Sequence, residues 1–396
     1  LANAGVVAAL ASFLVTAVGT VLVILLNYPQ DVRMLIILGL VMTLLPRAEY
    51  LLSEATVNGL EKMEWIVLVR FPATLLRVIL SIGLLALGCG LHVLFWLWAA
   101  YYLLAFAAYL MLFHTLVSGF SLKLDAHLIR SLAVRALPFV ATLFVGETLA
   151  KFDRIFLSKW EGTDAVGAYA VGIMLVQTLL LIATAIMNAL SPALSRAYHR
   201  SKQQFSLVVS QLFRLLFAAV FPVMLSAIAL ARPLILLVFG DDYGESIPVL
   251  QIAALALLPS FLGRLMYRTL LASDNERIAF RVSLVSGTLG LVLNIILIPR
   301  YGLLGASAVS VTVALARLVQ SMYNVARGVV QFDFARALLL PVFCAGLSVA
   351  LYLALVQWNA IAAWLLSLAG FVALALGTRV VSRDDLSMLS LRGSRD

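Results

Sequence analysis

Long apolar runs, separated by short polar turns, cover nearly the whole 396-residue chain. Several of these runs exceed the roughly 18 residues that are typical of a membrane-spanning helix. Reading each run against the turn signals at its ends predicts about twelve helices. They are expected at residues 5–27, 33–55, 64–89, 91–116, 133–158, 164–193, 205–239, 246–272, 278–299, 302–327, 336–356 and 358–381. The expected fold class is therefore an all-α integral membrane protein.

The composition supports this interpretation and excludes several other classes. Hydrophobic residues make up 63% of the chain, charged residues only 12%, and the mean hydropathy is +1.07. A soluble domain has about 25% charged residues. The two cysteines and four histidines show no spacing typical of a metal site or a disulfide framework. We expect no metal and no bound cofactor, and we do not interpret the net charge of +9 as a sign of nucleic-acid binding.

The basic residues predict the orientation of the chain. One set of alternate connections, with the C-terminal tail, holds 15 Lys and Arg residues, whereas the opposite connections hold only Arg33, Lys159 and Arg300. Because cytoplasmic loops are enriched in Lys and Arg, both ends of the chain are expected in the cytoplasm. Several aromatic residues near predicted helix ends are expected to be interfacial anchors; they are Trp65, Trp96, Trp98, Tyr101, Tyr102, Trp160 and Trp358.

An internal similarity predicts the domain organisation. Residues 50–83 and 267–298 each contain a helix end, a small polar turn and an acidic-basic step (Glu61-Lys62 and Glu276-Arg277) that opens the next helix. The two steps lie 215 residues apart, which corresponds to six helices and predicts two repeated six-helix lobes. The expected parts are an N-terminal lobe remainder (1–116), a cytoplasmic linker (117–132), a C-terminal lobe (133–327), and two extra helices with a tail (328–396). About two further helices are expected upstream of residue 1.

Two blocks of sequence carry a family resemblance. The first is KFDRIFLSKWEGTDAVGAYAVG (151–172), followed by ALSPALSR (189–196). The second comprises residues 238–276, with a VFGDDYG loop, and LNIILIPRYGLLGASAVSV (293–311). These blocks resemble the second half of bacterial polysaccharide flippases, members of the multidrug/oligosaccharidyl-lipid/polysaccharide superfamily. The resemblance is good over about residues 140–330.

The resemblance implies both fold and function. Proteins of this family are inner-membrane transporters with two helical lobes about a central cavity. They move lipid-linked oligosaccharides to the periplasmic leaflet by alternating access. The implied cargo is therefore a polyprenyl-pyrophosphate-linked glycan in the bilayer, and the implied partners are glycosyltransferases and a polysaccharide polymerase. The implied pathway is O-antigen, capsule or exopolysaccharide assembly.

Basic residues inside the predicted spans are candidates for contacts with such a cargo. Ionisable side chains in membrane helices usually face a cavity or one another, and a guanidinium can bind two phosphate oxygens at once. Arg214 and Arg232 are close enough to helix ends to reach the interface. The candidates for a cationic cavity are Arg47, Arg70, Arg77, Lys151, Arg154, Arg264, Arg268 and Arg317.

One charged stripe leaves three interpretations open. Glu147, Lys151 and Arg154 advance by four and three residues and would share one face of a helix, whereas Asp153 would point elsewhere. The stripe could pair internally between helices, line the cavity, or anchor the helix at the periplasmic interface. If a proton or Na⁺ drives transport, Glu147 and Glu49 are the candidate coupling residues.

Competing functions remain at this stage. A drug exporter of the same superfamily would favour an acidic or aromatic cavity, whereas basic residues predominate in these spans. A peptidoglycan-precursor flippase is not separated by sequence. A membrane glycosyltransferase or ligase would normally carry acidic or histidine motifs in a large outward loop, and the longest outward loop here has only about ten residues. We therefore do not expect an enzyme.

Overall fold

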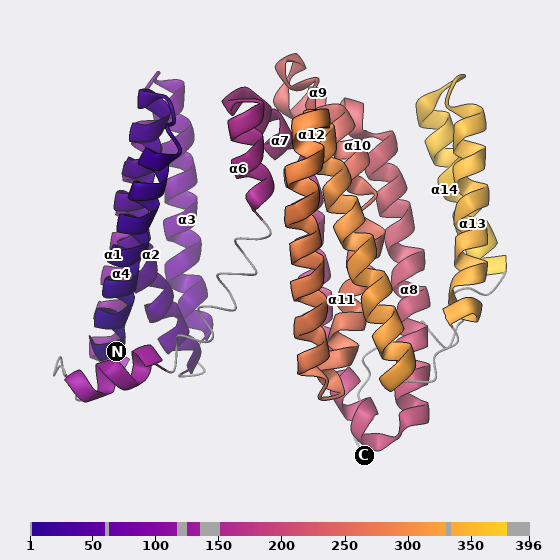
Figure 1. Cartoon of the computed structure of the whole chain (residues 1–396), viewed down its shortest axis with the longest axis horizontal. Helices are drawn as coiled ribbons and strands as arrows, with labels where there is room; N and C mark the ends of the chain where they lie inside the picture. The colour runs from indigo at the N-terminus through magenta and orange to yellow at the C-terminus, as the bar shows by residue number, and fades with distance from the viewer. Residues whose placement is uncertain (1, 60–62, 117–124, 135–150, 330–333, 378–396) are drawn as a thin grey trace. The chain divides into compact units, whose positions relative to one another are not determined.

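The computed structural model describes residues 2–59, 63–116, 125–134, 151–329 and 334–377 (Figure 1). All regular elements within these ranges are helices, as the apolar runs predict. Nine of the helices in these ranges are long and apolar enough to cross a membrane, and residues 360–375 form a shorter apolar helix. The predicted fold class, an all-α integral membrane protein, is therefore confirmed.

The chain folds into two compact units, Leu1–Thr142 and Leu143–Asp396. Unit 1 contains α1 (Ala2–Leu25), α2 (Gln30–Gly59), α3 (Met63–Ala86) and α4 (His92–Leu116). Helix α2 packs on both α1 and α4, and α3 packs mainly on α4. The change from unit 1 to unit 2 falls between residues 135 and 150, outside the described ranges, so the expected domain limits stay a prediction.

The core of unit 1 is unusually rich in tyrosine. Tyr50 of α2 and Tyr101, Tyr102 and Tyr109 of α4 are each at most 9% exposed, and they form one cluster. Two of the expected interfacial anchors, Tyr101 and Tyr102, are therefore core residues instead. The reason is that α4 turns the face that carries them toward α2 and α3.

Unit 2 is larger and is built around α8 and the α10–α11 pair. Its long core runs through α7, α8, α10 and α11, and α13 and α14 pack on each other and on α8. The helices are α6 (Phe152–Trp160), α7 (Thr163–Arg200), α8 (Lys202–Ala229), α9 (Ala231–Phe239), the 3-10 turn η1 (Asp241–Tyr243), α10 (Ser246–Ala254), α11 (Leu257–Ala272), α12 (Glu276–Gly328), α13 (Phe334–Leu355) and α14 (Ala360–Gly377).

The structure corrects three expected helix boundaries in unit 2. The expected helix 205–239 is interrupted at Leu230, and the expected helix 246–272 is interrupted at residues 255–256. Helix α7 continues to Arg200, beyond the expected end at residue 193. A proline follows each interruption, at the third position of the new helix, where its missing N–H costs nothing.

Helix α12 consists of two limbs that meet at Gly302. This residue has φ 52° and ψ −129°, a backbone conformation that glycine adopts without the steric cost of a Cβ atom. The predicted helices 278–299 and 302–327 are therefore present as the two limbs. Gly305, just past the turn, lies directly against the backbone of Leu297 in the other limb.

Gly305→Ala is expected to destabilise unit 2 by about 1–3 kcal/mol, the usual cost of overpacking a tight contact. The added Cβ would overlap the Leu297 carbonyl oxygen and lie 2.8 Å from the carbonyl carbon, and neither backbone atom can rotate away. The thermal unfolding midpoint in detergent measures the effect. The matched control is Gly346→Ala in α13, where no atom lies within 4 Å of the new Cβ. Equal midpoints for the two variants would contradict the close contact.

Candidate functional site

Three of the expected cavity arginines lie together in unit 1, on facing stripes of three helices. We call this set of side chains the aromatic seam. It consists of Arg47, Tyr50 and Glu54 of α2, Arg70, Thr74 and Arg77 of α3, and Trp98, Tyr101, Tyr102 and Tyr109 of α4. On α2 and α3 the members recur every three or four residues, so they share one face. On α4 the consecutive Tyr101 and Tyr102 lie one turn after Trp98 and about two turns before Tyr109, on one side of the helix.

Aromatic rings hold the guanidinium of Arg77. Its Cζ atom lies 4.0 Å from the centroid of the Trp98 ring and 5.2 Å from that of Tyr101. A ring face attracts a cation without neutralising its charge. The Tyr101 hydroxyl lies 3.3 Å from the Thr74 hydroxyl, which ties α4 to α3. Arg77 is therefore placed firmly while its positive charge remains available.

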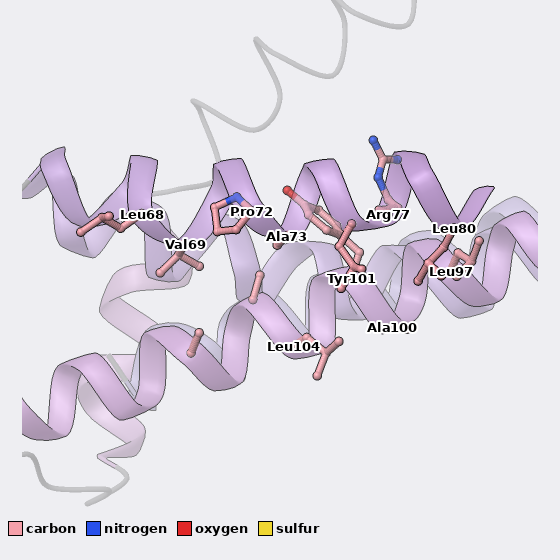
Figure 2. A pocket seen from close by; sticks show the side chains of 13 residues that line it. Leu68, Val69, Pro72, Ala73, Arg77, Leu80, Leu97, Ala100, Tyr101 and Leu104 are labelled. Carbon is pink, nitrogen blue, oxygen red and sulfur yellow. The ribbon is translucent and has the colours of Figure 1, made fainter. Parts of the chain in front are cut away.

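A cavity of about 330 Å³ lies between α3 and α4 beside the seam (Figure 2). Its lining is almost entirely apolar, and Arg77 and Tyr101 are the residues of the seam that contribute to it. In Figure 2 the guanidinium of Arg77 points away from the apolar lining around Leu104. The cavity therefore suits an apolar group, whereas the charge of Arg77 lies at its side.

The other two arginines of the seam are more exposed than Arg77. Nη1 of Arg70 lies 3.2 Å from Oε1 of Glu54, and the two side chains are 62% and 14% exposed. Arg47 is exposed, and its charge acts on the nearby Tyr102. The seam thus brings three positive charges and one carboxylate to one side of unit 1.

Unit 2 holds a second arrangement, which we call the α7 ladder. Three residues of α7 accept hydrogen bonds from arginines of neighbouring helices: Gln177 from Arg154 (3.4 Å), Thr184 from Arg264 (2.7 Å) and Asn188 from Arg268 (2.7 Å). The acceptors advance by seven and four residues, so they share one face of α7 over about 16 Å.

Arg317 of α12 extends the ladder. Its Nε donates to the hydroxyl of Ser286 (3.3 Å) in the other limb of α12. The charge of Arg264 is close enough to those of Arg317 and Arg268 to interact with them. In the described part of the chain, no carboxylate lies within ion-pair distance of Arg264, Arg268 or Arg317. Neutral groups therefore hold three neighbouring cations, and no carboxylate of the described residues compensates their charges.

The stretch that opens unit 2 also contains a firm polar contact. The buried Tyr169 of α7 donates to Oδ2 of Asp153 at 2.7 Å, and the Arg154 N–H donates to Oδ1. Asp153 therefore joins α6 to α7. Lys151 is exposed at the start of α6. Glu147 lies outside the described residues, so the three interpretations of its stripe stay open.

Glu49, the other expected coupling residue, is not part of the seam. Its carboxylate lies against Gly5 of α1, where a Cβ atom would approach Oε2 to 3.2 Å. Arg47, two residues earlier, points elsewhere on α2. The structure thus separates Glu49 from the arginines, and its role in coupling stays a prediction.

Sequence reasoning missed the neutral and aromatic partners of these arginines. The sequence pattern places Trp98 and Tyr101 at the interface, and Thr184, Asn188 and Ser286 carry no charge that would distinguish them from other polar residues in a helix. The seven-residue spacing from Gln177 to Thr184 was a visible signal in the sequence. The spacing does not show which helix contacts this face of α7. That α11 does so is known only from the packing of α11 on α7.

Sequence comparison places the chain among known proteins. The profile of a family described as "Polysaccharide biosynthesis protein" matches residues 3–248. The capsular polysaccharide biosynthesis protein CapF of Staphylococcus aureus is 25% identical over 189 residues, which are 47% of this chain and 47% of CapF. The match therefore covers about half the length of this curated relative.

Solved structures share the fold. The lipid II flippase MurJ, in an inward closed conformation, has a TM-score of 0.76 at 13% identity, over 95% of this chain and 83% of MurJ. The MATE transporter VcmN of Vibrio cholerae has a TM-score of 0.54 at 17% identity, over 81% of this chain and 77% of VcmN. At these identities the likeness establishes a shared fold and no more.

Proposed function

The chain belongs to the polysaccharide biosynthesis protein family, and we propose that it moves a polyprenyl-pyrophosphate-linked oligosaccharide across the bacterial cytoplasmic membrane. In this proposal it works by alternating access and supplies O-antigen, capsule or exopolysaccharide assembly. It acts as a transporter and not as an enzyme. Both ends of the chain face the cytoplasm, as the distribution of basic residues predicts.

The α7 ladder is the observation that carries the proposal. A charged side chain is costly within a membrane, yet among the described residues Arg264, Arg268 and Arg317 have only neutral hydrogen-bond partners. Such a group is expected where an anionic ligand supplies the missing charge. The pyrophosphate of a lipid-linked glycan is such a ligand, and each guanidinium can bind two of its oxygens.

The cargo explains why a membrane protein would keep these charges. The polyprenyl tail can remain in lipid, but the phosphates and sugars must cross a region that cannot hydrogen-bond to them. Arginines of the seam and of the ladder replace part of the lost hydration. A cationic drug would be repelled by both groups, so an exporter of cationic drugs is disfavoured.

A peptidoglycan precursor is the second candidate cargo. It carries the same lipid-linked pyrophosphate, and the fold resembles that of the lipid II flippase. The two cargoes differ only in the headgroup, which the arginines do not distinguish. A proton or Na⁺ gradient is the proposed driving force, with Glu49 and Glu147 as candidate coupling residues. Glycosyltransferases and a polymerase are the proposed partners.

Deletion of the gene is expected to trap the lipid-linked glycan on the cytoplasmic leaflet, because its phosphates and sugars do not cross the apolar bilayer core unaided. The measurement is the fraction of polyprenyl-linked glycan that a periplasmic glycosidase can cleave in spheroplasts. The same assay with a peptidoglycan-precursor probe separates the two cargoes. An unchanged cleavable fraction for both glycans would contradict the proposal.

A further inference from the structure

The contact between Arg70 and Glu54 differs from the other arginine contacts described above. Arg77 is held by aromatic rings, and the ladder arginines are held by hydroxyl and amide oxygens. Arg70 instead contacts a carboxylate through one nitrogen and one oxygen, 3.2 Å apart. A guanidinium commonly binds a carboxylate through two parallel hydrogen bonds. The single contact leaves most donors of Arg70 free for another anion.

The two partners also differ in how firmly they are placed. The side chain of Glu54 is 14% exposed, and its charge acts on the buried Tyr50 and Tyr109 beside it. The side chain of Arg70 is 62% exposed. The carboxylate is thus enclosed by the seam, whereas the guanidinium can be reached from outside unit 1.

The Arg70–Glu54 pair lies near the connection between α2 and α3. Glu54 lies five residues before the end of α2, and Arg70 seven residues after the start of α3. At 1.5 Å per residue, both lie within about 11 Å of the α2–α3 connection. Arg77 lies a further seven residues along α3, which is about 10 Å. Arg70 is therefore the outer cation of the seam and Arg77 the inner one.

We infer that Glu54 is an internal substitute for the phosphate of the cargo, and that it keeps weakly binding single phosphates off the seam. This inference rests on the proposed function. In the empty protein the Glu54 carboxylate occupies Arg70. A phosphate must displace it, and the pyrophosphate of the cargo can do so because one phosphate reaches Arg70 while the other offers charge to the rest of the seam.

The physical reason for such a substitute is the abundance of competing anions. Phospholipids with a single phosphate are abundant in the bilayer, and an uncompensated, exposed Arg70 would bind that phosphate. Glu54 raises the cost of binding for every anion by the same amount, the free energy of breaking one ion pair. The ratio of the two affinities is therefore unchanged, but a monophosphate, which has fewer contacts to offer, is left with an affinity too weak to occupy the seam. A diphosphate starts from a higher affinity and still binds, so the built-in competitor sets a lower limit on the affinity that a ligand must have.

Calorimetric titration of the purified protein in detergent tests the inference. It measures the affinities for inorganic pyrophosphate and for inorganic phosphate. Glu54→Gln keeps the shape of the side chain and removes its charge. We expect it to bind both anions about threefold to fivefold more tightly, the range expected from an exposed ion pair. Binding of phosphate should rise from undetectable or weak to measurable. In the background of Arg70→Gln, the Glu54 substitution should have no effect on either affinity.

Two controls separate this effect from others. Glu64→Gln, at the exposed start of α3, changes the net charge equally without touching Arg70, and its affinities should match those of the wild type. If Glu54→Gln does not fold, Glu54→Asp, which withdraws the carboxylate by one methylene, should show the same direction with a smaller size.

The outcomes are distinct. If the wild-type protein binds pyrophosphate and Glu54→Gln binds it equally or less tightly, Glu54 is a structural residue and the inference is wrong. If Glu64→Gln tightens binding as much as Glu54→Gln, the effect is one of net charge and the inference is also wrong. If neither the wild type nor Glu54→Gln binds pyrophosphate, the proposed function itself fails.

Discussion

Arg77→Gln is expected to lower glycan export by about tenfold to a hundredfold, since a hydrogen bond to a charged group contributes about 1.5–3 kcal/mol. The charge of Arg77 is available to a ligand because the rings of Trp98 and Tyr101 hold the guanidinium. No carboxylate in the part of the chain that the structure describes forms an ion pair with it. Glutamine keeps a polar side chain at the position and removes only the cation. The measurement is surface polysaccharide per molecule of transporter, in a strain that lacks its own copy.

The matched control is Arg33→Gln, at the opposite end of α2 from Glu54. It removes the same charge outside the seam and should export at the wild-type rate. Trp98→Phe keeps a ring under Arg77 and should retain most of the activity, whereas Trp98→Leu should not. Normal export by Arg77→Gln at a normal protein level would exclude the seam as a cargo site.

Arg264→Gln is expected to change stability and export in opposite directions. Its charge interacts with those of Arg317 and Arg268, and no carboxylate lies nearby in the described part of the chain. Removing one of three neighbouring like charges should raise the thermal unfolding midpoint. Removing a cation from the α7 ladder, the proposed site for the pyrophosphate, should lower export about tenfold or more.

This opposition distinguishes a binding site from a structural one. A residue that only holds α11 against α7 would lose stability and export together when replaced. The matched control is Arg232→Gln on α9, an exposed arginine outside the ladder, which should change neither quantity. If Arg264→Gln lowers the unfolding midpoint, the ladder is a packing feature, and the proposal loses its main support.

The fold could be predicted from the sequence because lipid imposes a simple rule. Every backbone polar group in the bilayer must be satisfied within the chain, so long apolar runs become helices. The interruptions at Leu230 and at residues 255–256 were missed because hydropathy continues through them. Pro233 and Pro259, each just past an interruption, were the signals that hydropathy alone does not weigh.

The site could be predicted only in part. The sequence identifies Arg264 and Arg268 as one face of a helix, because four residues make about one turn. It cannot say that Thr184 and Asn188 meet them, since that depends on how α7 and α11 pack. It also assigned Tyr101 to the interface, because a tyrosine near a helix end has the same pattern whether it faces lipid or another tyrosine.

Both arrangements place arginines by contacts that leave their charge available, through rings in the seam and through neutral oxygens in the ladder. This common feature supports a single anionic cargo. Arg70 differs from these arginines because its partner, Glu54, is a carboxylate. In the inference above, a phosphate of the cargo replaces this contact.

The most direct test of this account is transfer of the cargo in a purified system. The protein is reconstituted in liposomes that contain a polyprenyl-pyrophosphate glycan with a fluorescent sugar, and a membrane-impermeant quencher reports which leaflet holds the sugar. We predict protein-dependent transfer that Arg77→Gln and Arg264→Gln slow and Arg33→Gln does not. Transfer no faster than in protein-free liposomes, or equally fast in all variants, would contradict the central claim.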